Sequence, residues 1–238
     1  MTKTRSKENE LVFLPLGGSN EIGMNLNAYG YGPAENRKWI VVDVGVTFGD
    51  NSTPGVDVIV PDPTYLEGED IVGIVLTHAH EDHIGALGWL WPRIKAPLYA
   101  TPFTAFLIRE KLRDAGLLDR VTLHEVPLGG QIDLGPFNVE MVTITHSIAE
   151  PNGLAIKTPL GTVLHTGDWK IDDDPVVGER TDVDTIKRLG DEGVLALVCD
   201  STHVSPAGLA GSAGAAAVAP AEPPLGPPRR GAGARLPP

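Results

Sequence analysis

Short apolar runs alternate with turn-forming residues along most of the chain. The runs at residues 39–44 and 71–77 are rich in Val and Ile, which predicts strands that are buried on both faces. Further strands are predicted at residues 11–16, 121–126, 137–145, 154–158, 162–166 and 194–199.

Apolar residues at helical spacing occur in other segments. Residues 84–94 place their apolar side chains near one face, and Pro92 is expected to disturb the end of this helix. Residues 101–115 predict a second helix that stops at Gly116, and residues 182–190 predict a third. This mixture of strands and helices indicates an α/β protein with mixed sheets.

The pattern ends abruptly near residue 205. Of the 32 residues from 207 to 238, 23 are Ala, Gly or Pro, and none is aromatic. Such a segment cannot bury enough apolar surface to offset its ordering entropy, so residues 205–238 are predicted to be a disordered tail. Residues 1–10 mix charges of both signs and are also predicted to be disordered, which leaves one domain at residues 11–204.

Composition restricts the classes of function. The chain has 238 residues, a formal net charge of −12 and a single cysteine, Cys199. No run approaches the roughly 18 to 20 apolar residues of a membrane-spanning helix, and the first residues do not resemble a signal peptide. One cysteine excludes an internal disulfide framework, so we expect a cytoplasmic protein. An acidic chain has no overall attraction for nucleic acid, so a phosphate substrate would require local positive charge such as a metal ion.

The strongest chemical feature is the heptapeptide THAHEDH at residues 77–83, between a predicted strand and a predicted helix. Packing so many polar groups at a strand end is costly without a cation. In an extended loop, His78 and His80 project to the same side and can bind one ion, while Asp82 and His83 can reach a second. Nitrogen and oxygen ligands without thiolate favour zinc, with manganese as the alternative.

Two further polar residues follow predicted strands, His146 after residues 137–145 and Asp168 after residues 162–166. Side chains at strand ends of an α/β sheet converge on one rim, so we expect both beside the histidine cluster. Either residue taken alone is more typical of a structural role. His165 is expected to be structural or to support the ligands from behind.

The pattern His78-x-His80-x-Asp82-His83, with His146 and Asp168 downstream, resembles the metal-binding motif of the metallo-β-lactamase superfamily. The surrounding sequence resembles bacterial ribonuclease J, of the β-CASP group, over about residues 11–204. The matching stretches are LGGSNEIG (16–23), VDVG (42–45), FGD (48–50), PGVD (54–57), IVPD (59–62), THSI (145–148), AIKTPLG (155–161), HTGD (165–168) and CDST (199–202).

The resemblance implies an αβ/βα sandwich with two zinc ions. It implies one ion held by His78, His80 and His146, the other by Asp82 and His83, and Asp168 bridging both. Asp43 would steady the histidine loop. Asp82, His83, Asp168 and Asp200 are the expected catalytic residues, with a turn cap at the end of a strand as the alternative role of Asp200.

The family resemblance also implies an activity and partners. It implies 5′-to-3′ exonuclease and endonuclease action on RNA with a 5′-monophosphate, in RNA processing and decay, by a protein that forms dimers or tetramers. Proteins of this family continue into a β-CASP domain and then return to complete the sandwich. Here both parts are expected to be missing, so poor solubility or weak activity is expected of this chain. The composition of residues 205–238 suggests DNA read in a shifted frame.

Two other functions are compatible with the same residues. One is a hydrolase of a thioester, lactone or β-lactam, because one fold and one metal site serve many reactions. The other is an inactive fragment that binds zinc. Activity on RNA, on a thioester or β-lactam substrate, or on neither would distinguish these functions.

Overall fold

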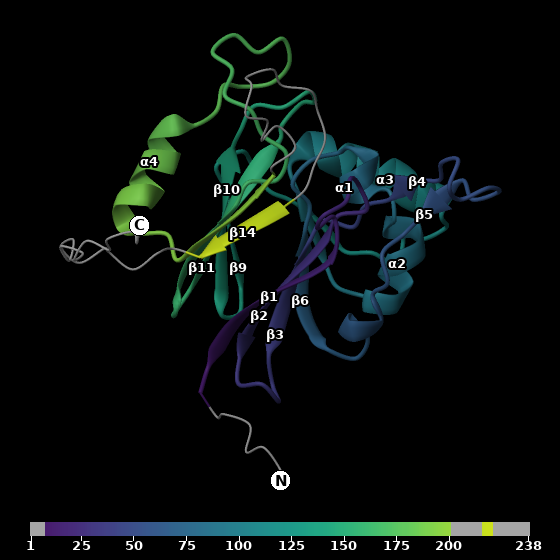
Figure 1. Ribbon diagram of the computed structural model, residues 1–238, viewed down its shortest axis with the longest axis horizontal. Coiled ribbons are helices and arrows are strands. Elements are labelled where there is room, and N and C mark those ends of the chain that lie inside the picture. The colour runs from purple at the N-terminus through teal and green to yellow at the C-terminus, as the bar shows by residue number, and fades with distance from the viewer. Residues whose placement is uncertain (1–7, 201–215, 221–238) are drawn as a thin grey trace, which may run out of the picture.

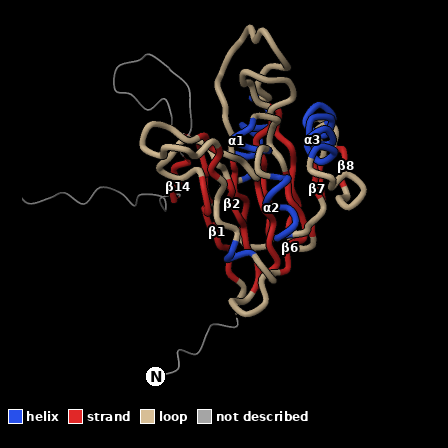
Figure 2. The backbone as a smooth tube through the Cα atoms, turned by 90° about the vertical axis from the view of Figure 1, so that its right-hand side faces the viewer, coloured by secondary structure: helices blue, strands red, loops and turns tan. Residues whose placement is uncertain are grey.

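The structure is a computed structural model that describes residues 8–200 and the backbone of residues 216–220. Its centre is a pair of face-to-face sheets with helices on both outer faces (Figure 1). Figure 2 views the side of the first sheet, where α1, α2 and α3 lie in front of the strands. α4 covers the second sheet on the opposite side of the molecule (Figure 1).

The first sheet combines antiparallel and parallel pairs. Its strands, in spatial order, are β1 (Glu10–Gly17), β2 (Leu26–Gly32), β3 (Lys38–Val42), β6 (Asp70–Val75), β7 (Leu98–Ala100) and β8 (Leu123–Glu125). The pairs β1–β2 and β2–β3 are antiparallel, and the pairs from β3 to β8 are parallel. The ends of β3 and β6 therefore lie at the same edge of the sheet, where the histidine motif begins.

The second sheet is mostly antiparallel. Its strands, in spatial order, are β14 (Ala216–Pro220), β13 (Ala196–Asp200), β12 (Gly161–His165), β11 (Asn152–Thr158), β10 (Phe137–Thr143) and β9 (Gln131–Leu134). Among the described strands of this sheet, only β12 and β13 pair in parallel. A small separate hairpin joins β4 (Thr47–Phe48) to β5 (Val58–Ile59).

The helices divide between the two outer faces. They are η1 (Thr64–Leu66), α1 (Glu81–Ile84), α2 (Leu87–Ile94), α3 (Pro102–Asp114) and α4 (Val183–Glu192). The α4 helix begins after Asp182, whose side chain accepts a hydrogen bond from the backbone nitrogen of Thr185. This four-layer arrangement confirms the predicted αβ/βα sandwich.

Successive side chains of the central strands point to opposite faces of the sheet and so enter separate hydrophobic cores. Trp39 and Val41 of β3 face the cluster under α1 to α3, whereas Ile40 and Val42 face the cluster between the sheets. Both faces of β3 are buried, which explains the unbroken apolar run that predicted this strand. A smaller cluster, around Leu189 of α4, covers the outer face of the second sheet.

The predicted strands are all found, with ends that differ by a few residues. β3 ends two residues before the predicted limit because Asp43 has a left-handed backbone with φ of 65°. The sequence did not predict β2, β7 or β9. β2 carries two glycines and an asparagine, β7 has three residues and β9 has four, so none shows a clear apolar run.

The helix predicted at residues 84–94 is wrong in detail. The chain forms α1 and α2 as separate helices, and α1 starts before the prediction, within the histidine motif. Pro92 lies inside α2, which ends only where Lys95 adopts a left-handed backbone. The break between the helices lets α1 present its first turn to the strand ends while α2 packs along the sheet.

The two termini were predicted to be disordered. Residues 1–7, 201–215 and 221–238 lie outside the described residues. Glu10 belongs to β1, and residues 216–220 form β14 antiparallel to β13, so these parts depart from the prediction. β13 offers unpaired backbone groups on that side, and a paired strand satisfies them. In the described part of the chain, no helix has the length and apolar character needed to cross a membrane.

Candidate metal centre

Asp43 organises the loop that carries the histidine motif. Its Oδ1 accepts a hydrogen bond from the backbone nitrogen of Thr77 at 2.8 Å, and its Oδ2 accepts one from the Thr77 hydroxyl at 2.8 Å. Oδ2 also lies 2.7 Å from Nδ1 of His83. A left-handed backbone is unfavourable for a residue with a side chain, and here these bonds hold Asp43 in it. Asp43 therefore fixes both ends of the motif.

The segment after Asp43 fixes the first turn of α1. The backbone nitrogens of Val44 and Val46 donate to the carbonyls of His83 and Glu81, at 2.7 and 3.0 Å. Between them lies Gly45, where a Cβ atom would stand 1.6 Å from the backbone oxygen of Asp82. Only glycine allows this close approach, so the VDVG sequence has a direct structural reason.

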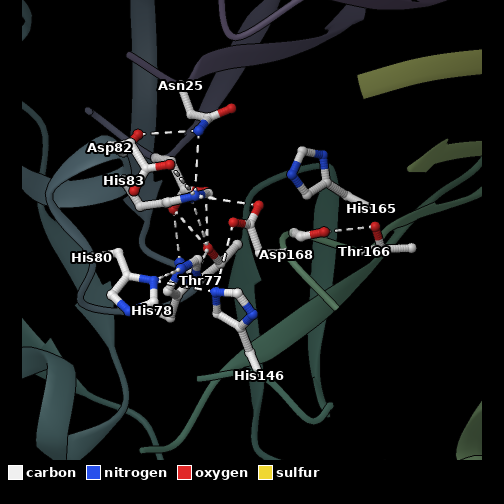
Figure 3. Close-up of polar contacts among 12 residues, drawn as sticks. Asn25, Thr77, His78, His80, Asp82, His83, His146, His165, Thr166 and Asp168 are labelled. Atoms are coloured by element: carbon white, nitrogen blue, oxygen red, sulfur yellow. Dashed lines mark hydrogen bonds and ion pairs between the residues drawn. The ribbon is translucent and has the colours of Figure 1, made fainter. Parts of the chain in front are cut away.

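Three histidines converge at the edge of the two sheets (Figure 3). Nδ1 of His80 lies 3.1 Å from Nε2 of His78 and 3.1 Å from Nε2 of His146. His78 is fully buried, while His80 and His146 are partly exposed. Each offers one ring nitrogen to a common point, as the ligands of one metal ion do.

A second group lies beside the first and shares His78 with it. It consists of His78, His83 and Asp168, whose ligand atoms all lie within 4.8 Å of one another. Oδ1 of Asp168 is 3.4 Å from Nε2 of His83, and its Oδ2 is 3.6 Å from Nε2 of His146 (Figure 3). Oδ2 of Asp82 is 3.5 Å from the same His83 nitrogen. Asp168 thus faces both groups.

Burial keeps the first group of histidines neutral. Burial lowers the pKa of His78 well below 6.5, and repulsion from the other histidines lowers it further. The pKa values of His80 and His146 are also lowered, mainly by burial, although Asp168 opposes the shift. Neutral imidazoles have a free lone pair, which is the form that binds a metal ion.

His83 has the opposite charge state. Burial alone would lower its pKa, but Asp43, Asp168 and Asp82 surround the ring and raise the pKa well above 6.5. Burial raises the pKa of Asp168 and of Asp82, but His83 outweighs it and both carboxyl pKa values are lowered. The site therefore stabilises positive charge between carboxylates, where a divalent cation can replace the proton of His83.

The donor set fits a divalent metal ion. It combines histidine ring nitrogens with the ionised carboxylate of Asp168, and neither group contains a thiolate. These are ligands for zinc and for manganese, whereas an oxygen-only set would favour magnesium or calcium. The structure brings together the six residues that were predicted to meet in space, namely His78, His80, Asp82, His83, His146 and Asp168. Their assignment to individual ions stays a prediction.

Neither metal-competent group includes Asp200 or Asp82, although Asp82 lies 3.5 Å from His83. Asp200 ends β13, and its backbone nitrogen donates to the hydroxyl of Thr166 at 3.2 Å. That hydroxyl in turn donates to the backbone oxygen of Gly167 at 2.7 Å, so Asp200 is linked to the turn before Asp168. The catalytic role predicted for Asp200 stays a prediction.

Sequence reasoning missed Asn25 and Thr77. Nδ2 of Asn25 donates to the backbone oxygen of Asp82 at 3.1 Å and lies 3.3 Å from Nε2 of His83. The hydroxyl of Thr77 donates a hydrogen bond to the carboxylate of Asp43. Asn25 is 57 residues from Asp82, so no local pattern signals the contact. Thr77 lies within the motif, but a threonine at a strand end is common without a role at a site.

With this geometry established, the chain can be compared with known proteins. Residues 27–224 match the family model "Metallo-beta-lactamase superfamily". The chain therefore belongs to this superfamily.

Proteins similar to this chain include several named as ribonucleases. The chain is 50% identical over 200 residues to the protein named Ribonuclease J of Sinorhizobium meliloti, which covers 83% of this chain and 36% of the relative. It is 42% identical over 211 residues to Ribonuclease J of Corynebacterium glutamicum, over 87% of this chain and 29% of the relative. The chain thus spans about a third of the length of these relatives.

A solved structure supports the fold alone. A protein of unknown function from Enterococcus faecalis V583 superposes with a TM-score of 0.60 at 18% sequence identity. The match covers 86% of this chain and 53% of that protein.

Proposed function

We propose that this chain carries the metal centre of a ribonuclease J-type enzyme that hydrolyses RNA phosphodiester bonds. One observation carries the proposal. Two metal-competent groups share His78 and face each other through Asp168, at the rim where the two sheets meet. The named relatives supply the substrate class, because fold and metal site alone serve many reactions.

We propose two zinc ions, with manganese as the alternative. His78, His80 and His146 would hold one, Asp82 and His83 the other, and Asp168 would contact both. Bound ions of this kind supply a Lewis acid that activates water near neutral pH and neutralises charge on phosphate oxygens. They would also supply the local positive charge that a chain of net charge −12 otherwise lacks for RNA.

The protein's own groups prepare the site. Burial keeps the three histidines of the first group unprotonated. Asp43 accepts from Nδ1 of His83, which directs Nε2 of His83 toward Asp82 and Asp168. Asp200, linked through Thr166 to the turn before Asp168, is proposed to supply a further carboxylate at this rim.

The proposed substrate is RNA with a 5′-monophosphate, cleaved from the 5′ end and also internally. We propose that the enzyme acts in the cytoplasm in RNA processing and decay, as a dimer or tetramer. Light scattering on the purified chain measures its oligomeric state directly. A monomer at all concentrations would contradict the proposed assembly and leave the metal site untouched.

The activity is tested on RNA labelled at its 5′ end. We expect the chain to release nucleotides from 5′-phosphorylated RNA with added zinc or manganese. Asp82→Ala removes a carboxylate 3.5 Å from His83 and is expected to reduce the rate by at least about 100-fold. Equal rates for the two proteins would contradict the proposed site.

A matched carboxylate controls for the loss of charge. Asp133 is an exposed residue of β9 whose carboxylate accepts a bond from Asn138, and Asp133→Ala is expected to keep full activity. Nitrocefin and a thioester serve as alternative substrates. Turnover of either one without RNA cleavage would replace the ribonuclease proposal by the second hydrolase function.

A further inference from the structure

A buried side-chain hydrogen bond joins the two sheets near the metal centre, three residues from Asp168 in the chain. The hydroxyl of Tyr29, on β2 of the first sheet, lies 2.8 Å from Nδ1 of His165, on β12 of the second. Tyr29 is 0% exposed and His165 is 4% exposed. The two rings meet edge to face, with centroids 6.0 Å apart. The bond therefore has a defined direction as well as a defined length.

The charge states of both partners favour this bond. Burial and the nearby Asp43 raise the pKa of Tyr29, so the hydroxyl keeps its proton. Burial lowers the pKa of His165 to about 4, so the ring is neutral at neutral pH, and its Nε2–H tautomer accepts the bond from the Tyr29 hydroxyl at Nδ1. The partners sit in the apolar cluster between the sheets, among residues such as Ile40 and Val198. A polar pair in such a place gives directionality that two apolar side chains would not.

The pair connects β2, which neighbours the strand leading to Asp43, with β12, which leads to Asp168. Tyr29 pairs with Ile40 on β3, and β3 leads directly to Asp43, which holds His83. His165 is the last residue of β12, three residues before Asp168. The contact of 3.4 Å between His83 and Asp168 thus spans the two sheets, and the Tyr29–His165 bond also spans them.

The loop of His146 has its own connections to the first sheet. The backbone nitrogen of Asn152 donates to the carbonyl of Thr77 at 3.1 Å. The carboxylate of Glu150 accepts a bond from the backbone nitrogen of Phe103 at 2.8 Å. These bonds do not involve His165, so the loop of His146 is tied to the first sheet independently of the Tyr29–His165 bond.

We propose that Tyr29 and His165 are positioning residues that hold Asp168 opposite His83 and thereby set the affinity for the second divalent ion. The inference rests on the proposed function only in taking the centre to bind two ions. The proposal predicts unequal effects on metal affinity. Loss of the Tyr29–His165 bond lowers the affinity for the second ion, whereas the affinity for the ion at His78, His80 and His146 stays the same.

The test is a titration of the metal-free chain with Co²⁺, followed by visible absorption, with zinc competition to obtain affinities. Tyr29→Phe is expected to weaken the second binding step by roughly 10- to 100-fold, the usual effect of losing a residue that orients a ligand. The first step is expected to stay unchanged. Tyr31→Phe is the matched control, because Tyr31 lies on the same strand and its hydroxyl bonds only the exposed side chain of Asn9 among the contacts of the described residues.

Two substitutions of His165 separate positioning from packing. His165→Asn can place a carbonyl oxygen near the position of Nδ1 and is expected to keep the second ion, whereas His165→Leu is expected to lose it. The double variant Tyr29→Phe, His165→Leu leaves neither partner buried without a hydrogen bond. Its free energy of unfolding is therefore expected to be higher than that of His165→Leu alone, while its affinity for the second ion stays low. This pattern would not arise from packing alone.

The outcomes are separable from those of the proposed function. If the unsubstituted chain binds two ions and every variant binds both equally well, the positioning role is wrong and the metal centre stands. If both ions are lost together in proportion to lost unfolding free energy, the role is packing alone and the proposal is also wrong. If the unsubstituted chain binds fewer than two ions, the two-ion centre and this inference both fall.

Discussion

At the scale of single residues, the centre depends on side chains that do not themselves face a metal ion. Asp43 holds Thr77 and His83, and Asn25 supports the backbone of Asp82. The spacing of the histidine motif was enough to predict four of the facing residues, because ligands close in sequence share one loop, whereas His146 and Asp168 were predicted from the ends of their strands. The supporting residues were not predictable, since Tyr29 and His165 are 136 residues apart.

His165 gives a prediction on pH dependence. Its pKa is about 4 in the folded chain, against 6.5 when exposed, because burial opposes the charged form more than Asp43 and Asp168 favour it. The unfolded state therefore binds the extra proton between these values. The contribution of neutral His165 to the free energy of unfolding is fully present above pH 6.5. It is lost as pH falls toward 4, with a slope of up to about 1.4 kcal/mol per pH unit.

The measurement is urea unfolding of the metal-free chain from pH 7 to pH 5. The free energy of unfolding is expected to fall more steeply for the unsubstituted chain than for His165→Asn, which has no titrating ring. Parallel pH profiles for the two proteins would mean that His165 is accessible to protons in the folded state.

At the scale of secondary-structure elements, the site depends on where strands stop. β3 and β6 end side by side, and β10 and β12 end on the facing sheet, so four strand ends bring Asp43, the histidine motif, His146 and Asp168 together. Apolar runs predicted those strands. They did not predict β2 or the division between α1 and α2, because tertiary contacts of the VDVG segment decide where α1 starts.

Gly45 is the test at this scale. In Gly45→Ala the new methyl group would meet the backbone of Asp82 and His83, which cannot rotate away as a side chain could. We expect a loss of about 2–4 kcal/mol in unfolding free energy, comparable to strong overpacking, and weaker metal binding. Gly190→Ala is the control, since nothing lies within 4 Å of a Cβ there. Equal stability of the two variants would contradict the described packing of α1.

At the scale of the whole molecule, metal ions would act as a clamp between the sheets. The histidine motif belongs to the first sheet, while His146 and Asp168 belong to the second. Within each sheet, hydrogen bonds hold the strands together, but between the sheets most of the contact is the apolar cluster around Phe137 and Val75. Ions that bind the folded chain and not the unfolded chain stabilise it by mass action.

Thermal unfolding measures this clamp. At zinc concentrations about 100 times the dissociation constant, binding contributes about 2.7 kcal/mol, which corresponds to a rise in Tm of roughly 5–10 °C for a chain of this size. We expect Asp168→Ala to lose most of this rise and His124→Ala, outside both groups, to keep it. An identical Tm with zinc and with a chelator would argue against binding between the sheets.

The most direct test of the centre is an anomalous difference map at the zinc absorption edge, from crystals of the zinc-loaded chain. We expect two peaks at the rim, one in contact with His78, His80 and His146, the other in contact with Asp82 and His83, and Asp168 beside both. Absence of anomalous density among these six residues, in protein shown by elemental analysis to contain zinc, would contradict the account.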